Sequence, residues 1–211
     1  MISLQKLFGK DDRFFDLLEG AAEEARHSVQ ALGRGLSQAN APLSMDEFIQ
    51  ARRVEKKIAA QISEALVETF VTTLEREDIE LLSEALYKIP KTVEKFAERF
   101  TICGSLIHGI DFSKQIRLLE GATDLVVKMV QSLRYLGSGQ LDAVKSMNAK
   151  LQELEGQGDQ LILEVLEDLW SGRHETTKVI VLKDLYELLE KIIDRCRDAG
   201  KAVTHIVLKN S

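Results

Sequence analysis

The chain has 211 residues, of which 45% are hydrophobic and 29% are charged, and this balance suits a globular protein that can bury a core. Its formal net charge is −6, and no concentrated basic patch occurs in the sequence, so a nucleic-acid-binding role has little support. The longest uncharged apolar stretch, residues 100–110, is about half of the ~20 residues that span a bilayer. We therefore expect a soluble protein that could reach a membrane only by docking.

The cysteines and the first residues of the chain favour a cytoplasmic protein. Cys103 and Cys196 are far apart, no C-x-x-C motif exists, and the N-terminus has no apolar run typical of a signal peptide. A reducing compartment is the simplest interpretation of this cysteine usage. The apolar periodicity places Cys196 in a core and His205 at the surface, and we expect Trp170 to be a packing residue.

Helical periodicity runs almost from end to end, and only two prolines interrupt the chain. Ser44 and Glu47 form a capping-box pattern, Asp111 is a candidate N-cap, and Gly109, Gly139 and Gly172 lie in breaks. These signals predict six helices, over residues 11–38, 44–72, 76–107, 111–136, 140–170 and 175–208. Short connections between long helices imply antiparallel neighbours, and the fold class is therefore all-α.

The six predicted helices divide into two sets of three, with a first half at residues 1–109 and a second at 110–211 of one domain. When Glu55 is aligned with Glu155, the apolar positions of the second and fifth helices coincide, including Phe70 with Trp170. In the third and sixth helices the matching apolar positions are Leu82, Leu86, Ile89, Val93, Phe96 and Phe100 with Leu185, Leu189, Ile192, Cys196, Ala199 and Val203. This shared frame predicts two three-helix bundles around one long core.

Six acidic side chains on the last two predicted helices have helical spacing. Those of the sixth helix follow one another at intervals of three, four and four residues, and fall within an arc of roughly 80°. Hard cations prefer oxygen ligands, so the set is a candidate metal site. It comprises Glu155, Asp159, Glu187, Glu190, Asp194 and Asp198.

A solvated helix face is the alternative interpretation of the same acids. On the sixth helix they lie opposite the apolar arc, and Lys183, Lys191, Arg197 and Lys201 stand three or four residues from them. Such pairs stabilise a helix by roughly 0.2 to 0.5 kcal/mol each without a metal. From the residues alone, both interpretations stay open.

The first half lacks most of these acids. Asp159 aligns with Ala59, and Glu190, Asp194 and Asp198 align with Tyr87, Lys91 and Lys95. Any metal site of this kind is therefore expected only in the second half.

Several short motifs occur in a fixed order along the chain: residues 14–19, Glu68-Thr69-Phe70-Val71, Arg76-Glu77-Asp78-Ile79 and the E-x-x-x-D patterns of the second half. In these motifs the chain resembles the PhoU-like family, in particular the shorter phosphate-transport regulators associated with Pit-type phosphate transporters. The resemblance implies a PhoU-like six-helix fold and a regulatory protein of phosphate transport, docked on a Pit-type transporter at the inner face of the membrane. It also implies bound metal, with iron, manganese, zinc and magnesium as candidates. A homodimer is compatible with this interpretation.

Two other functions compete with the regulatory one. A metal-dependent hydrolase or redox protein would use the acids as a multinuclear carboxylate site, with open coordination positions and a pocket. A metal-free helical scaffold would use them only for ion pairs. No nucleophile elbow or glycine-rich phosphate-binding loop occurs, so we expect a protein that is not an enzyme.

Overall fold

The computed structural model describes residues 4–37, 43–107, 109–136 and 139–210, with side chains described from residue 12 onward except at 105. Within these ranges the all-α prediction is confirmed, and short 3₁₀ turns η1 (Gly104–Leu106) and η2 (Leu133–Tyr135) follow the third and fourth helices. The long helices are α1 (Leu4–Ser37), α2 (Asp46–Glu68), α3 (Arg76–Cys103), α4 (Ser113–Ser132), α5 (Leu141–Leu169) and α6 (Thr176–Lys209).

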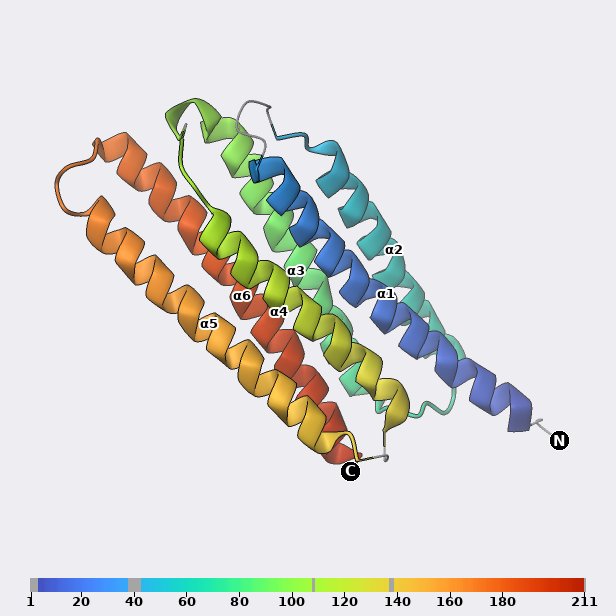
Figure 1. The fold of residues 1–211 in the computed structure, drawn as a ribbon. Helices are drawn as coiled ribbons and strands as arrows, with labels where there is room; N and C mark the ends of the chain where they lie inside the picture. Colours follow the sequence, from blue (N-terminus) through green and yellow to red (C-terminus); the bar gives the residue numbers. More distant parts are fainter. Residues whose placement is uncertain (1–3, 38–42, 108, 137–138, 211) are drawn as a thin grey trace.

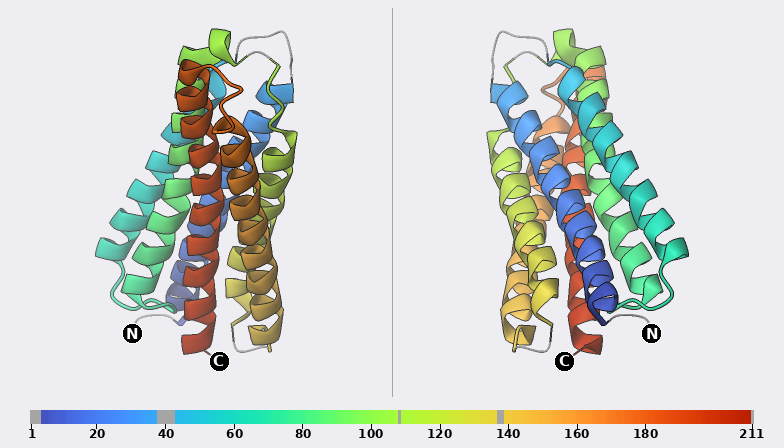
Figure 2. Two further views of the ribbon diagram at one scale, coloured as in Figure 1. Left: turned by 90° about the vertical axis from the view of Figure 1, so that its left-hand side faces the viewer. Right: turned by 90° about the vertical axis from the view of Figure 1, so that its right-hand side faces the viewer.

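The helices lie side by side in an elongated bundle (Figure 1). Consecutive helices run in opposite directions, so the start of α1 and the end of α6 are at the same end of the molecule (Figures 1 and 2). Within the first half α1, α2 and α3 contact one another, and within the second half α4, α5 and α6 do the same. The pairs α1–α4 and α3–α6 join the two halves, whose buried apolar residues form one continuous cluster.

The aligned apolar frame of α3 and α6 is buried as the sequence predicts. Each aligned residue from Leu82 to Phe96 is at most 1% exposed, and so is each from Leu185 to Val203. Only Phe100 is partly exposed, and its ring packs on Phe96 and Phe112. Because both helices bury this frame, they form the centre of the molecule.

Several predicted helix boundaries shift, and α2 shows why. It ends at Glu68 rather than at residue 72, because the Arg76 side chain donates hydrogen bonds to the carbonyls of Leu66 and Thr69. These contacts satisfy carbonyls that have no partner within the helix. The first helix begins at Leu4 rather than residue 11, and α3 and α4 each end about four residues early as 3₁₀ turns. The predicted loop residues 38–42 and 137–138 lie outside the described residues.

The predicted capping box at Ser44 is wrong. Helix α2 begins at Asp46, Ser44 Oγ accepts a hydrogen bond from the Asp46 amide, and Glu47 accepts one from Arg34 of α1. Glu47 is therefore used to tie α1 to α2. Asp111 does act at the start of α4, where its carboxylate accepts a hydrogen bond of 2.8 Å from the Ser113 amide.

Cys196 is fully buried and His205 is exposed, as predicted, but the prediction for Trp170 is wrong. Its side chain is 68% exposed beyond the end of α5, and the aligned Phe70 beyond the end of α2 is fully exposed. Both residues follow closely on the end of a helix, and their exposure shows that neither ring is covered by the rest of the described chain. Because α2 and α5 end at opposite ends of the bundle, the two aromatic residues lie far apart (Figure 1).

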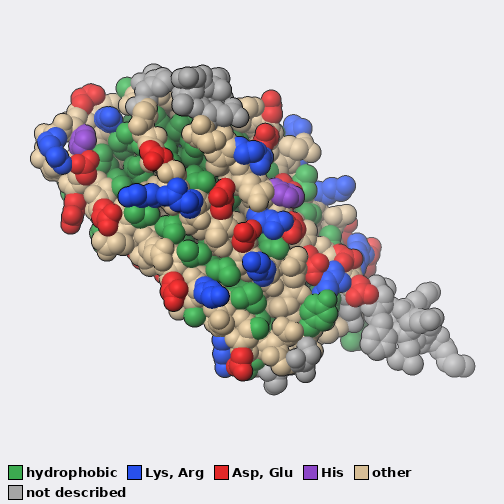
Figure 3. All heavy atoms as spheres, viewed as in Figure 1, with side chains coloured by type: hydrophobic (Ala, Val, Ile, Leu, Met, Phe, Trp, Pro, Cys, Tyr) green, Lys and Arg blue, Asp and Glu red, His purple; other side chains and the backbone are tan. Residues whose placement is uncertain are grey.

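The surface carries mixed charges. Acidic and basic side chains alternate over the face formed by α1, α4 and α5, and hydrophobic side chains are visible between them (Figure 3). None of the described helices is both long and apolar enough to cross a membrane.

Two glycines, Gly158 of α5 and Gly200 of α6, let the two helices approach closely, whereas Gly156 of α5 does not lie at the contact. A Cβ atom at Gly158 would lie 2.8 Å from Ile193 Cδ1 of α6, and one at Gly200 would lie 2.5 Å from Leu151 Cδ2 of α5. A Cβ atom at Gly156 would meet nothing within 4 Å. The close approach places the polar residues of the two helices within reach of one another.

We expect Gly158→Leu to lower the free energy of unfolding by about 1 to 3 kcal/mol, because the added side chain overpacks the α5–α6 contact. The matched variant Gly156→Leu should raise it by roughly 0.5 to 1 kcal/mol, because leucine favours the helix over glycine. Urea unfolding followed by circular dichroism measures both. Equal effects of the two variants would contradict the close packing.

Candidate functional site

The six predicted metal ligands lie on α5 and α6, which contact each other along their length. Helix α6 also contacts α3 and α4, so its polar residues occupy narrow strips between apolar contacts. The side chains of Glu155 and Asp194 are only 20% and 32% exposed. On α6 itself, the side chains of Glu187 and Asp198 are 45% and 38% exposed, so these two acids keep the solvated character that the alternative interpretation expects.

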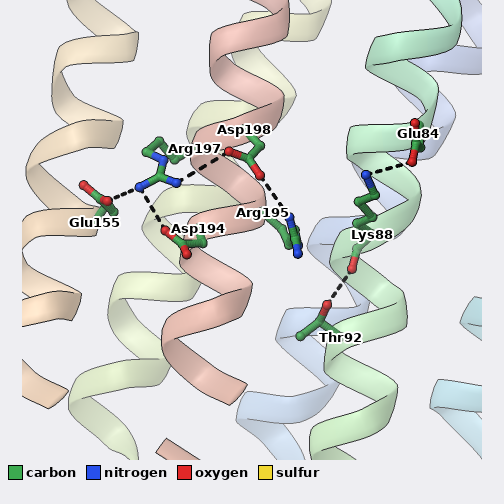
Figure 4. Close-up of polar contacts among 8 residues, drawn as sticks. All are labelled: Glu84, Lys88, Thr92, Glu155, Asp194, Arg195, Arg197 and Asp198. Carbon is green, nitrogen blue, oxygen red and sulfur yellow. Dashed lines mark hydrogen bonds and ion pairs between the residues drawn. The ribbon is translucent and has the colours of Figure 1, made fainter. Parts of the chain in front are cut away.

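Arg197 of α6 lies among these acids. Its Nη1 atom donates a hydrogen bond to Glu155 of α5 and forms an ion pair of 3.0 Å with Asp194 Oδ1 (Figure 4). Its Nη2 atom is 3.6 Å from Asp198 Oδ1. A single guanidinium group thus joins one carboxylate of α5 to two of α6.

Asp198 and Glu187 of α6 also form ion pairs with basic residues other than Arg197. Asp198 also accepts a hydrogen bond of 3.1 Å from Arg195, which points away from Glu155 (Figure 4). Glu187 forms an ion pair with Lys183 one turn earlier on the same helix. The acidic stripe of the sequence is therefore divided between at least two sets of ion pairs.

Asp159 and Glu190 have raised pKa values, partly because negatively charged carboxylates lie near them. Burial raises the pKa of Asp159, and the carboxylates of Glu155 and Asp194 raise it further. Burial likewise raises the pKa of Glu190, with additional repulsion from Asp194 and Asp159. Arg197 opposes both shifts. The structure thus brings Glu155, Asp159, Glu190 and Asp194 into one electrostatic cluster around Arg197, which we call the second-half cluster.

This arrangement does not match a metal centre. Calcium or magnesium would need several oxygen atoms at about 2.0 to 2.6 Å from one point. Across the described residues, no three His, Cys, Asp or Glu side chains are placed so that they could hold a metal ion. Arg197 bonds to carboxylates that would have to converge on a metal ion. Metal binding at the six predicted ligands stays a prediction from the sequence.

A second cluster, absent from the sequence-based prediction, lies in the first half. Arg52 of α2 is 5% exposed and donates hydrogen bonds to Glu55 Oε2 at 2.7 Å, to Glu94 Oε2 at 3.1 Å and to the Tyr87 hydroxyl at 2.8 Å. Glu55 is 1% exposed, and burial raises its pKa to about 7 although Arg52 lowers it. We call Arg52, Glu55, Tyr87 and Glu94 the first-half cluster. The sequence offered only one indication of this cluster, namely the spacing of three residues between Arg52 and Glu55 on one predicted helix.

A groove of about 500 Å³ lies between α3 and α6. Among the six predicted ligands only Asp198 lines it, so the groove does not open onto the second-half cluster. Its lining residues are Leu81, Glu84, Ala85, Lys88, Asp198, Lys201, Ala202 and His205.

Two named proteins are similar to this chain in sequence, whereas no protein-family model matches it. The UPF0111 protein YkaA of Bacillus subtilis (strain 168) is 30% identical over 149 residues, which are 69% of this chain and 70% of YkaA. A Rhizobium meliloti (strain 1021) protein with the provisional name pit accessory protein is 23% identical over 216 residues, covering 98% of this chain and 97% of the relative.

Two crystal structures from Shewanella oneidensis MR-1 share the fold. One is of a PhoU-like protein, with a TM-score of 0.74 and 19% identity. The other, provisionally described as a PhoU-like phosphate regulatory protein, has a TM-score of 0.68 and 17% identity. Both matches cover 93% of this chain and 99% of the other. The predicted PhoU-like six-helix fold is therefore confirmed.

The pKa shifts predict how Asp159 and Glu190 affect stability. Both pKa values are raised on folding, so the folded chain binds protons more readily than the unfolded chain, and stability falls as the pH rises through the raised pKa values. We expect the double variant Asp159→Asn plus Glu190→Gln to be more stable than the wild type at pH 7.5. Each substitution should contribute up to about 0.5 kcal/mol, and the gain should shrink towards pH 4.

Urea unfolding at both pH values, with a chelator present, measures this difference. Glu187→Gln is the control, because its carboxylate pairs with Lys183 and its removal should not stabilise the fold. A double variant less stable than the wild type at pH 7.5 would show that the two carboxylates have a favourable partner when charged.

Proposed function

We propose a function from one premise: the chain belongs to the UPF0111 family. We infer that it is a PhoU-like regulatory protein that assists inorganic phosphate transport by binding a Pit-type phosphate transporter. The observation that carries the proposal is the similarity to the pit accessory protein over almost the full length of both chains. The shared fold of the PhoU-like phosphate regulatory protein supports it.

We propose that the protein acts in the cytoplasm and docks at the inner face of the membrane. Its described helices include none that could cross a bilayer, so contact with a transporter would be made through exposed side chains. The turns after α2 and α5 each expose a large aromatic side chain, Phe70 and Trp170. A homodimer stays a prediction.

A binding role suits the clusters better than catalysis does. Arg52 and Arg197 are each bonded to more than one carboxylate. The α3–α6 groove reaches only Asp198 among the predicted ligands. A metal-dependent hydrolase or redox protein would need acids open to both metal and substrate. Metal binding by the second half would be an addition to the proposed function, and the function does not depend on it.

Co-purification tests the proposed partner. A tagged copy of the chain should retain the Pit-type transporter of its own organism from detergent-solubilised membranes, and deletion of its gene should change the initial rate of phosphate uptake. No retention together with unchanged uptake would contradict the proposal.

Two surface variants give this experiment a matched pair. Phe70→Ser and Trp170→Ser each remove one exposed aromatic ring, and both should leave the thermal midpoint of unfolding close to that of the wild type. Because the rings lie at opposite ends of the bundle, we expect one variant to reduce transporter retention and the other to leave it unchanged. Retention by both variants equal to that of the wild type would show that neither ring is the contact, and an equal loss in both would contradict a contact at one end.

A further inference from the structure

The two clusters occupy equivalent places in the two halves. Glu55 on α2 aligns with Glu155 on α5, and each of these glutamates accepts a hydrogen bond from an arginine. Glu55 and Arg52 are buried, whereas the side chains of Glu155 and Arg197 are 20% and 24% exposed. The same position in each half therefore has a carboxylate paired with a guanidinium group.

The arginine comes from a different helix in each half. In the first half it is Arg52 on α2, and its carboxylate partner on α3 is Glu94. Under the alignment of the two halves, Glu94 corresponds to Arg197 on α6, and Arg52 corresponds to Gln152 on α5. The positive charge has thus changed helices, while the glutamate on α2 or α5 has kept its place.

A guanidinium group can bind several carboxylates from two helices at once. It is planar, always charged and offers five N–H donors. Arg52 uses three nitrogen atoms for three partners on α2 and α3, and Arg197 joins α5 to α6. Each arginine therefore neutralises acids that would otherwise repel one another in a partly buried site.

A metal ion would compete with these arginines for the same oxygen atoms. A carboxylate oxygen directed at a guanidinium nitrogen would have to turn towards the metal, and the arginine would then lie beside a second cation. We propose that Arg52 and Arg197 are the built-in cations of the first-half and second-half clusters, so that the folded chain requires no metal at either of them. This inference does not depend on the proposed transporter.

Thermal unfolding and metal analysis of Arg197→Met test the second-half cluster. The wild type should keep the same midpoint in EDTA, in Mn²⁺ and in Zn²⁺, and should hold no stoichiometric metal by mass spectrometry after exposure to either ion and desalting. In EDTA, Arg197→Met should lower the midpoint by about 2 to 4 °C, because the acids lose their cation. Mn²⁺ or Zn²⁺ should restore part of this loss in the variant alone.

Arg195→Met is the matched control, because Arg195 lies on the same helix and bonds only to Asp198 among the acids shown in Figure 4. Its midpoint should fall less than that of Arg197→Met, and neither ion should raise it. Three results would overturn the inference: stoichiometric metal in the wild type, a lower wild-type midpoint in EDTA, or equal midpoints of Arg197→Met and the wild type in EDTA.

Arg52→Lys tests the first-half cluster without removing its charge. An ammonium group cannot reproduce the fork that reaches Glu55, Glu94 and Tyr87 together. We expect a lower midpoint in EDTA that neither Mn²⁺ nor Zn²⁺ restores, because the lysine ammonium group keeps a positive charge beside Glu55 and Glu94. A midpoint equal to that of the wild type would show that the guanidinium is not the element that joins α2 to α3.

Discussion

The packing of α6 against three other helices is the constraint on which the site depends. Apolar residues of α6 face α3, α4 and α5, and many of them are almost fully buried. Only narrow strips of the helix surface are left for polar side chains. Asp194 of α6 and the facing Glu155 of α5 are only 32% and 20% exposed, so each is less solvated than on a free surface and gains from a nearby positive charge. Arg197 supplies this charge for Glu155 and Asp194.

The same constraint is stronger in the first half. Glu55 is buried more completely than Glu155, and its pKa is raised to about 7 even with Arg52 in contact. Removing one partner of a buried ion pair is usually more damaging than replacing both, because the other charge is left without a partner. Arg52 and Glu55 therefore act as one unit. Through the bonds of Arg52 to Glu94 and Tyr87, this unit fixes how α2 packs against α3.

The helices, their order and the apolar repeat could be predicted because each depends on local spacing. The aligned positions of α3 and α6 are buried as the periodicity indicates. The site could not be predicted in the same way, since spacing along α6 does not determine how that helix is rotated towards α5. Arg197 was visible in the sequence only as a neighbour of acids on its own helix, whereas its contact with Glu155 is 42 residues distant. The prediction that Trp170 is a packing residue was wrong for a related reason, because periodicity does not reveal where the bundle ends.

A repeated frame with different charges gives the two halves different chemical properties. Tyr87, Lys91 and Lys95 stand where the second half has Glu190, Asp194 and Asp198, so one half is basic where the other is acidic. The apolar core tolerates this change because it lies on other faces of the same helices. Each cluster still needs a cation, and the chain provides it from α2 in one half and from α6 in the other.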